Sequence, residues 1–165
     1  MEDQEAFLRH AMEAYGDAVY RLALCRLQNT AEAEDVYQDV FLRLLRQPGR
    51  DWEGEHLKAW LLRTALNCCA DIRRRWKRHP VLALEEIVES PGETGPDTAE
   101  LWESVARLPE PMRLAVHLHY GEGYSTEEIA GIMGCTPATV RTRLYRARGK
   151  LRDLLGGYED EKPIP

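Results

Sequence analysis

Apolar residues recur at intervals of three and four residues along most of the chain, which is the spacing of amphipathic helices, and no stretch shows the alternation of a strand. In the first half this pattern predicts three helices. The first carries apolar residues at Phe7, Leu8, Met12, Tyr15, Val19, Leu22, Ala23 and Leu27. The second is capped by Thr30 and places on one face Val36, Val40, Phe41, Leu44 and Leu45.

The third helix is predicted from about Leu57, after a loop at residues 47–56 that contains Pro and Gly. Its buried face is expected to hold Leu62, Ala65, Leu66, Cys69, Ile72 and Trp76. The first part of the chain therefore predicts one helical domain, residues 1–79.

A change of character at Pro80 marks the end of that domain. Residues 80–97 combine Pro and Gly with several acidic residues and show weak periodicity, as expected for an acidic linker. A second helical domain is predicted at 98–155, followed by a tail at 156–165. The predicted fold is all-α, with two small helical domains joined by a flexible acidic linker.

Two capping signals lie close together in the second domain. Ser125 and Glu128 form the capping box of a short helix, which Gly134 ends in the position favoured for a left-handed residue. Thr136 caps the next helix, and Pro137 occupies its first position, where a missing N–H costs nothing. An inward-facing stripe follows at Val140, Leu144, Ala147 and Leu151. Two helices joined by such a tight turn predict a helix-turn-helix.

The charge distribution indicates that the chain binds anions at two places. The net charge is -6 and the pI is about 5.4, so indiscriminate coating of nucleic acid is not expected. Residues 71–79 nevertheless carry five Lys or Arg against one Asp, and residues 137–155 carry six against one. Two basic stretches in an otherwise acidic chain predict two separate anion-binding surfaces.

The side of the second basic helix that faces away from its apolar stripe is expected to contact DNA. A recognition helix presents its N-terminal residues to base edges in the major groove and its basic flanks to phosphates. The candidate duplex-binding residues are Thr136, Ala138, Thr139, Arg141, Thr142, Arg143, Tyr145 and Arg146, with Lys150 and Arg152 alongside. A merely solvated basic helix would not explain the paired caps and the turn between them.

Three segments, taken in order, resemble the extracytoplasmic-function (ECF) sigma factors, small bacterial factors that direct RNA polymerase to promoters. They are AEAEDVYQDVFLRLLRQ at 31–47, HLKAWLLRTALNCCADIRRRWKR at 56–78 and LPEPMRLAVHLHYGEGYSTEEIAGIMGCTPATVRTRLYRARGKLR at 108–152. The resemblance implies that the first domain binds the core polymerase and contacts the minus-ten element as it melts. It implies that the second domain binds the duplex minus-thirty-five element through the helix-turn-helix.

The resemblance also implies roles for residues of the first domain. Positions that face the polymerase in the family hold Asp35, Gln38, Asp39, Leu42 and Arg43. Positions that meet the non-template strand hold Trp60, Arg63 and Asn67, and the residues expected at phosphates are Arg73, Arg74, Arg75, Lys77 and Arg78. Trp52, in the predicted loop, would stack on a flipped-out base, and simple packing of this side chain is the alternative.

A stand-alone helix-turn-helix regulator is the alternative function, and it would bind promoter DNA tightly without polymerase. An enzyme is not expected, because no Gly-rich phosphate loop, nucleophile elbow or carboxylate pair stands out. His117 and His119 lie two residues apart on a predicted helix and cannot face one metal together near Cys135. We therefore expect no cofactor and no metal.

The remaining expectations concern location and partners. The four cysteines form no C-x-x-C pair, which favours burial as small apolar residues in a reducing compartment. The N-terminus lacks a signal-peptide layout, and no apolar run approaches the roughly 20 residues of a membrane helix. We expect a cytoplasmic protein without membrane insertion, whose partners are core RNA polymerase, promoter DNA and a separate anti-sigma factor.

Overall fold

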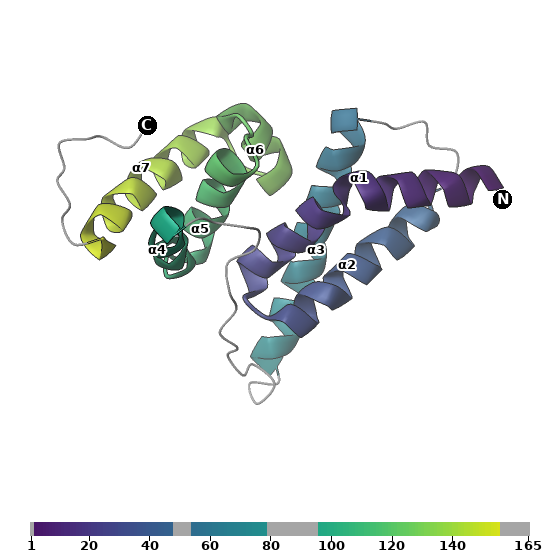
Figure 1. The fold of residues 1–165 in the computed structure, drawn as a ribbon, viewed down its shortest axis with the longest axis horizontal. Coiled ribbons are helices and arrows are strands. Elements are labelled where there is room, and N and C mark those ends of the chain that lie inside the picture. The colour runs from purple at the N-terminus through teal and green to yellow at the C-terminus, as the bar shows by residue number, and fades with distance from the viewer. Residues whose placement is uncertain (1, 48–53, 79–95, 156–165) are drawn as a thin grey trace. The chain divides into compact units, whose positions relative to one another are not determined.

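The structure is a computed structural model that describes residues 2–47, 54–78 and 96–155, and every regular element within these ranges is a helix (Figure 1). The chain divides into two compact units, Met1–Val88 and Glu89–Pro165, which are described one at a time. The predicted all-α fold is confirmed. Residues 80–95 of the predicted linker and the tail at 156–165 lie outside the described residues.

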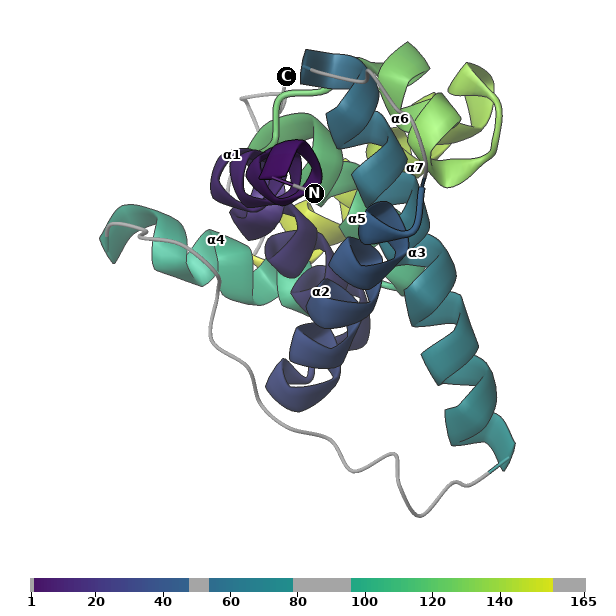
Figure 2. The same ribbon diagram turned by 90° about the vertical axis from the view of Figure 1, so that its right-hand side faces the viewer.

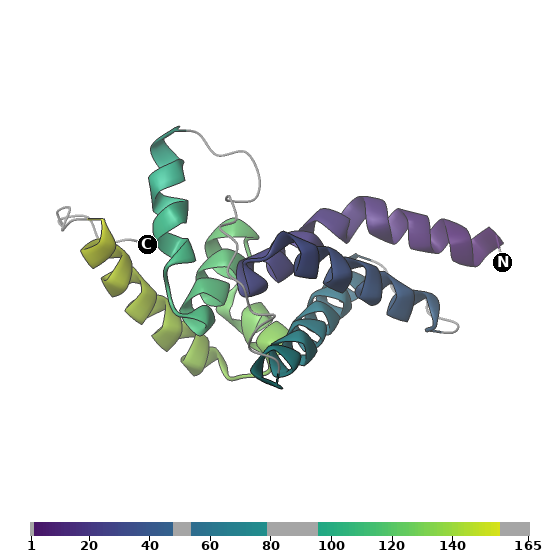
Figure 3. The same cartoon turned by 90° about the horizontal axis from the view of Figure 1, so that it is seen from below.

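The first unit packs three helices: α1 (Glu2–Leu27), α2 (Thr30–Leu45) and α3 (Gly54–Arg78). Each helix contacts the other two. Helices α1 and α2 run side by side in opposite directions (Figure 3), and α3 crosses them as one uninterrupted helix (Figure 2). The side chains buried between them include Val19, Leu22, Val36, Val40, Leu57, Leu61, Leu62 and Cys69. This shared apolar core is what fixes the outward faces of α2 and α3.

The turn between α1 and α2 differs from the predicted one by one residue. Gln28 has a φ of 54°, which ends α1, and Asn29 is extended, with a φ of -150°. The Asn29 side chain accepts a hydrogen bond from the backbone N–H of Glu32 at 2.8 Å. Asn29 is therefore the N-cap, and Thr30, predicted as the cap, is the first helical residue.

Two residues predicted on the apolar faces are exposed. Leu45 is 37% exposed because it lies about 100° round α2 from the buried Leu44, beyond the edge of the apolar stripe. Met12 is 36% exposed, in the part of α1 where Phe7 and Leu8 are only half-buried. Helix α3 begins at Gly54, before the expected Leu57, and the side chain of Trp76 lies outside the described residues.

Polar side chains tie the ends of α1 to its neighbours. At the N-terminal end, Gln4 donates a hydrogen bond to the carbonyl of Leu45 at 2.7 Å. At the C-terminal end, Arg26 donates to the carbonyl of Leu66 at 3.0 Å, and Arg73 donates to the carbonyl of Arg26 at 2.5 Å. Arg73 thus helps to hold the end of α1, and the phosphate contact expected from the sequence stays a prediction.

The second unit consists of α4 (Pro96–Ala106), α5 (Glu110–Val116), a π-helical segment (His117–Gly121), α6 (Thr126–Met133) and α7 (Pro137–Leu154). Its first helix begins two residues before the predicted boundary at 98. Helix α7 packs against α4, α5 and α6, and the buried side chains include Leu108, Leu118, Ile129, Ile132, Val140 and Leu144. Met133, the last residue of α6, is only half-buried.

Replacing Gly134 by Ala is expected to destabilise the second unit by about 1 kcal/mol, because an L side chain is disfavoured at its φ of 73°. Nothing else lies within 4 Å of the position that a Cβ would take. Gly131→Ala is the matched control: Gly131 lies inside α6 with open space around it, so it should stabilise by about 0.5–1 kcal/mol through helix propensity. Urea unfolding, followed through the NMR signals of α6 and α7, measures the change in the free energy of unfolding for both variants. A change of the same sign in both would contradict the left-handed role given to Gly134.

Candidate nucleic-acid and polymerase interfaces

The start of α6 is held by the predicted capping box. The Ser125 hydroxyl accepts a hydrogen bond from the backbone N–H of Glu128 at 3.1 Å. The Glu128 carboxylate in turn accepts one from the backbone N–H of Ser125 at 2.9 Å. Two N–H groups that the helix leaves unpaired are therefore satisfied, and the position at which α6 begins is fixed.

The turn from α6 to α7 has the predicted left-handed glycine and the predicted second cap. Gly134 has φ 73° and ψ 42°, and its N–H donates to the carbonyl of Ala130 at 2.8 Å. Thr136 is the N-cap of α7, and its side chain accepts a hydrogen bond from the N–H of Thr139 at 3.1 Å. Pro137 is the first residue of α7. These contacts make the helix-turn-helix tight, and they set where the outward face of α7 begins.

The two sides of α7 differ sharply in burial. Val140, Leu144, Ala147 and Leu151 are buried, as predicted. The exposed residues include Ala138, Arg141, Thr142, Tyr145 and Arg146, and Tyr145 is 73% exposed. A tyrosine so exposed lies on the same side of the helix as two exposed cationic side chains, Arg141 and Arg146, which suits contact with a base or a phosphate. We call Thr136, Ala138, Thr139, Arg141, Thr142, Arg143, Tyr145 and Arg146 the α7 face.

Two arginines of α7 have contacts within the unit. Arg143 is half-buried, with Nη1 3.9 Å from the sulfur of Cys135. Arg148 is half-buried and donates a hydrogen bond to the Tyr120 hydroxyl at 3.2 Å. Arg148 was not among the predicted site residues, and its contact ties α7 to the π-helical segment.

The outward side of α2 carries the five residues that the sequence singled out there. Asp35 and Gln38 are exposed, and Asp39 and Arg43 are half-buried. Leu42 is 49% exposed, on a helix that buries four other large apolar side chains. The surface therefore combines one exposed apolar side chain with carboxylate and amide acceptors and one cation. We call Asp35, Gln38, Asp39, Leu42 and Arg43 the α2 face.

The outward side of α3 combines an aromatic residue with cations. Trp60 is half-buried, and Arg63, Asn67, Arg74 and Arg75 are exposed. Spacings of three and four residues place Trp60, Arg63, Asn67 and Arg74 along one side of the helix. We call Trp60, Arg63, Asn67, Arg74 and Arg75 the α3 face. Trp52 and the side chain of Arg78 lie outside the described residues, so their predicted roles stay predictions.

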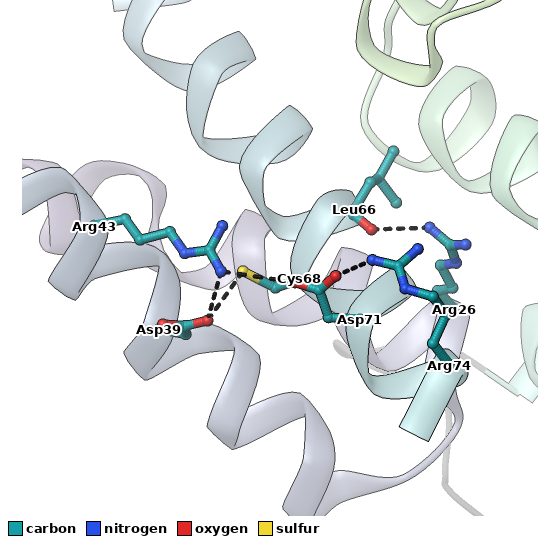
Figure 4. A network of polar contacts seen from close by, with 7 residues as sticks. All are labelled: Arg26, Asp39, Arg43, Leu66, Cys68, Asp71 and Arg74. Carbon is teal, nitrogen blue, oxygen red and sulfur yellow. Dashed lines mark hydrogen bonds and ion pairs between the residues drawn. The ribbon is translucent and has the colours of Figure 1, made fainter. Parts of the chain in front are cut away.

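A chain of polar contacts connects the α2 face with the α3 face (Figure 4). Oδ2 of Asp39 lies 3.3 Å from Nη2 of Arg43 and 3.3 Å from Sγ of Cys68. The same Nη2 atom lies 3.8 Å from Oδ2 of Asp71, whose other carboxylate oxygen pairs with Arg74. Asp71 and Cys68 were not predicted as site residues. Asp71 is the one acidic residue of the basic stretch 71–79, and that isolation was its only signal in the sequence.

The histidines of the second unit serve separate contacts. Nε2 of His117 lies 3.4 Å from a carboxylate oxygen of Glu122, with both side chains buried, and Nδ1 of His119 lies 2.7 Å from the carbonyl of Tyr124. Within ranges 2–47, 54–78 and 96–155, no group of three or more His, Cys, Asp or Glu residues is placed to hold a metal ion. Over the same ranges, no helix has the length and apolar character needed to cross a membrane.

Comparison with known proteins matches both units to one family. The family model "Sigma-70 region 2" matches residues 11–79, and "Sigma-70, region 4" matches residues 98–151. The sigma factor CarQ of Myxococcus xanthus is 33% identical over 165 residues, which cover 96% of this chain and 91% of CarQ. The ECF sigma factor SigM of Mycobacterium tuberculosis is 32% identical over 154 residues, covering 92% of this chain and 76% of SigM.

The chain belongs to the ECF sigma factors. The fold of this sigma factor is similar to that of RpoE in its complex with the anti-sigma factor NepR from Bartonella quintana, with a TM-score of 0.73 at 23% identity over 92% of this chain and 98% of that one. It is also similar to CnrH in complex with the cytosolic domain of CnrY, with a TM-score of 0.63 at 23% identity over 94% and 91%. The sigma factor directs promoter-specific transcription initiation by RNA polymerase.

The thiol of Cys68 has a strongly raised pKa in this sigma factor. Burial, then its hydrogen bond to Asp39 and the negative charge of that carboxylate, raise the pKa of Cys68 from 9.0 to about 12, against a smaller opposing effect of Arg43. The group therefore stays a thiol at physiological pH and acts as a donor to Asp39.

Cys68 is expected to make stability fall at alkaline pH. Its folded pKa is raised, so the folded state retains a proton that the unfolded state loses, and the resulting stability is complete below pH 9 and declines from pH 9 towards 12. Cys68→Ser is the matched variant, because serine keeps a donor but does not titrate in this range. Between pH 8 and about pH 10.5, the urea midpoint of the native protein should fall relative to the midpoint of the variant. A difference between the two midpoints that does not change with pH would contradict the raised pKa of Cys68.

Proposed function

We propose that this sigma factor divides promoter recognition between the α7 face, which binds the duplex minus-thirty-five element, and the α3 face, which binds the melted minus-ten strand. The observation that carries the proposal is the orientation of α7. Its buried stripe packs one side of the helix against the rest of the second unit. The other side is exposed and carries Arg141, Tyr145 and Arg146. An N-capped helix with one basic, exposed side fits a major groove.

The α3 face has the composition of a single-strand site. Base stacking on an aromatic side chain is largely independent of sequence, and cations alongside hold the backbone. Trp60 offers part of its ring, since it is half-buried, while Arg63 and Asn67 are exposed next to it on the helix. Capture of unstacked bases there would favour the melted strand without any nucleotide hydrolysis.

The α2 face is the proposed site for core RNA polymerase. Its carboxylates and amide offer acceptors to a basic partner, and Leu42, 49% exposed, offers an apolar contact within them. Mixed surfaces of this kind bind through a few central side chains, and the polar rim adds orientation. We propose that the association is dissociable and takes place in the cytoplasm, where polymerase and chromosome are found.

A separate anti-sigma factor is proposed as a further partner, because the sigma factor RpoE, whose fold is similar, is found in a complex with the anti-sigma factor NepR. The proposed role is regulatory and requires no catalysis by the chain itself. The alternative, a stand-alone helix-turn-helix regulator, would leave the α2 face without a use.

The deciding experiment is a pull-down of purified core RNA polymerase with the full-length protein, followed by transcription from a pool of genomic promoters. Stable association and start sites that share two spaced upstream elements are expected. Absence of association, together with tight binding of duplex DNA by the protein alone, would support the stand-alone regulator.

Arg141→Ala is expected to weaken binding of the minus-thirty-five duplex by about 1–3 kcal/mol and to relax selectivity at one base pair, if the guanidinium contacts a base edge. Arg152→Ala is the control, because Arg152 is also exposed but lies about three turns further along α7, outside the α7 face. Its loss should weaken binding equally for all sequences or not at all. Electrophoretic mobility shifts of the polymerase complex on single-base variants of the element measure both.

Asp39→Arg is expected to impair association with core polymerase by tenfold or more, because a cation would face the basic partner proposed for the α2 face. Glu13→Arg, which makes the same charge change at an exposed position of α1, should leave association unchanged. Helical content measured by circular dichroism checks that both variants fold. Normal association of Asp39→Arg with polymerase would remove Asp39 from the interface.

A further inference from the structure

Asp71 lies where the α2 face and the α3 face meet (Figure 4). One oxygen of its carboxylate pairs with Arg74, one turn further along α3. The other lies 3.8 Å from Nη2 of Arg43 on α2. That Nη2 atom is nearer to Asp39, at 3.3 Å. A single guanidinium is therefore shared between a carboxylate of the α2 face and a carboxylate that lies among the residues of the α3 face.

The position of Asp71 on its helix is unexpected for a nucleic-acid surface. It follows Asn67 by four residues and precedes Arg74 by three, so it lies in the middle of the α3 face. Its side chain is 52% exposed, and the side chain of Arg74 is 66% exposed. A carboxylate at this place occupies a cation that would otherwise bind phosphates. On a surface built only for DNA this residue would weaken binding.

We propose that Asp71 is a positioning residue that withholds Arg74 from DNA until polymerase is bound, with Arg43 as the link. A basic polymerase side chain that binds Asp39 competes with Arg43 for the same carboxylate. Arg43 then moves closer to Asp71, the second carboxylate within its reach. Because its positive charge neutralises that carboxylate and repels Arg74, Arg74 is released to bind a phosphate. The inference rests on the proposed function of the two faces and adds the control of one by the other.

Cys68 strengthens the first step of this exchange. Its buried sulfur lies 3.3 Å from Oδ2 of Asp39, the same oxygen that Arg43 contacts. The thiol donates a hydrogen bond and keeps the carboxylate in place when Arg43 leaves. Asp39 therefore remains presented to the partner, and Arg43 is the group that moves.

The size of the effect follows from the exposure of the contacts. Partly exposed ion pairs such as Asp71–Arg74 are weak, so the release of Arg74 is expected to change affinity for single-stranded DNA by about two- to fivefold. Weak pairs also exchange rapidly, which suits a contact that must be given up each time polymerase binds.

The test uses the full-length protein, with and without saturating core polymerase. The probe is a fluorescein-labelled non-template-strand oligonucleotide that spans the minus-ten element of a promoter mapped by transcription. Fluorescence anisotropy gives its dissociation constant. Asp71→Asn is expected to tighten binding by the free protein about two- to fivefold and to leave binding by the polymerase complex unchanged, because Arg74 is already released there. In an Arg74→Gln background, Asp71→Asn should have no effect in either state.

Two arginines of α2 supply a matched pair of variants. Arg43→Gln removes the competitor for Asp71, so the polymerase complex should bind the oligonucleotide about two- to fivefold more weakly. Arg46→Gln removes the same charge from an exposed position three residues away, outside the α2 face, and should change nothing. Saturating polymerase keeps any loss of association from entering the comparison.

Each result has a definite meaning. An equal gain from Asp71→Asn in both states would indicate plain charge repulsion and overturn the inference. A gain that persists in the Arg74→Gln background would do the same, because Asp71 would then not act through Arg74. If the native polymerase complex fails to bind the oligonucleotide, the proposed α3 face fails and this inference fails with it.

Discussion

The burial of one apolar stripe along α7 is the constraint on which the second unit depends. Burying a Val or Leu side chain fully contributes about 1.5–3 kcal/mol, whereas an exposed ion pair contributes about 0.2–1 kcal/mol. Val140, Leu144 and Leu151 therefore decide how α7 is rotated, and its charges do not. The exposure of Tyr145 and Arg146 is a consequence of that rotation. The caps at Ser125 and Thr136 then fix where each helix of the pair begins.

Burial of the apolar side of α3 likewise divides the cations of the first unit into two groups. Arg26 and Arg73 are drawn to backbone carbonyls where α1 meets α3, and they hold the end of α1 in place. Arg74 and Arg75 follow Arg73 directly but lie on the exposed side of α3. Neighbouring arginines in one basic run thus have different tasks, and the helix turn of about 100° per residue is the reason.

Strong and weak interactions are also divided between fold and function. The core of the first unit is a continuous set of apolar contacts between three helices, and changing it would cost several kcal/mol. The contacts among Asp39, Arg43, Asp71 and Arg74 are partly exposed and exchange partners at little cost. A weak polar network on a rigid support can respond to a partner without disturbing the unit beneath it.

The sequence by itself determined the all-α class, the two helical units and the helix-turn-helix, because these depend on local periodicity and capping. The capping box at Ser125, the left-handed Gly134 and the stripe from Val140 to Leu151 were all predicted from short-range spacing. The family, too, could be inferred, since its three motifs are contiguous segments.

Only the tertiary structure decided which polar residues meet across helices. Cys68 and Cys69 are identical in type and both buried, and it is the sulfur of Cys68 that lies 3.3 Å from Asp39. Asp71 lies 32 positions from Asp39 in the chain, and nothing in either segment indicates that Arg43 joins them. The cap at Asn29 and the exposure of Leu45 likewise follow from how α1 and α2 meet. Such pairings depend on how the helices are rotated and how they cross, which the buried side chains of all three helices determine together. The spacing of residues within one helix does not predict them.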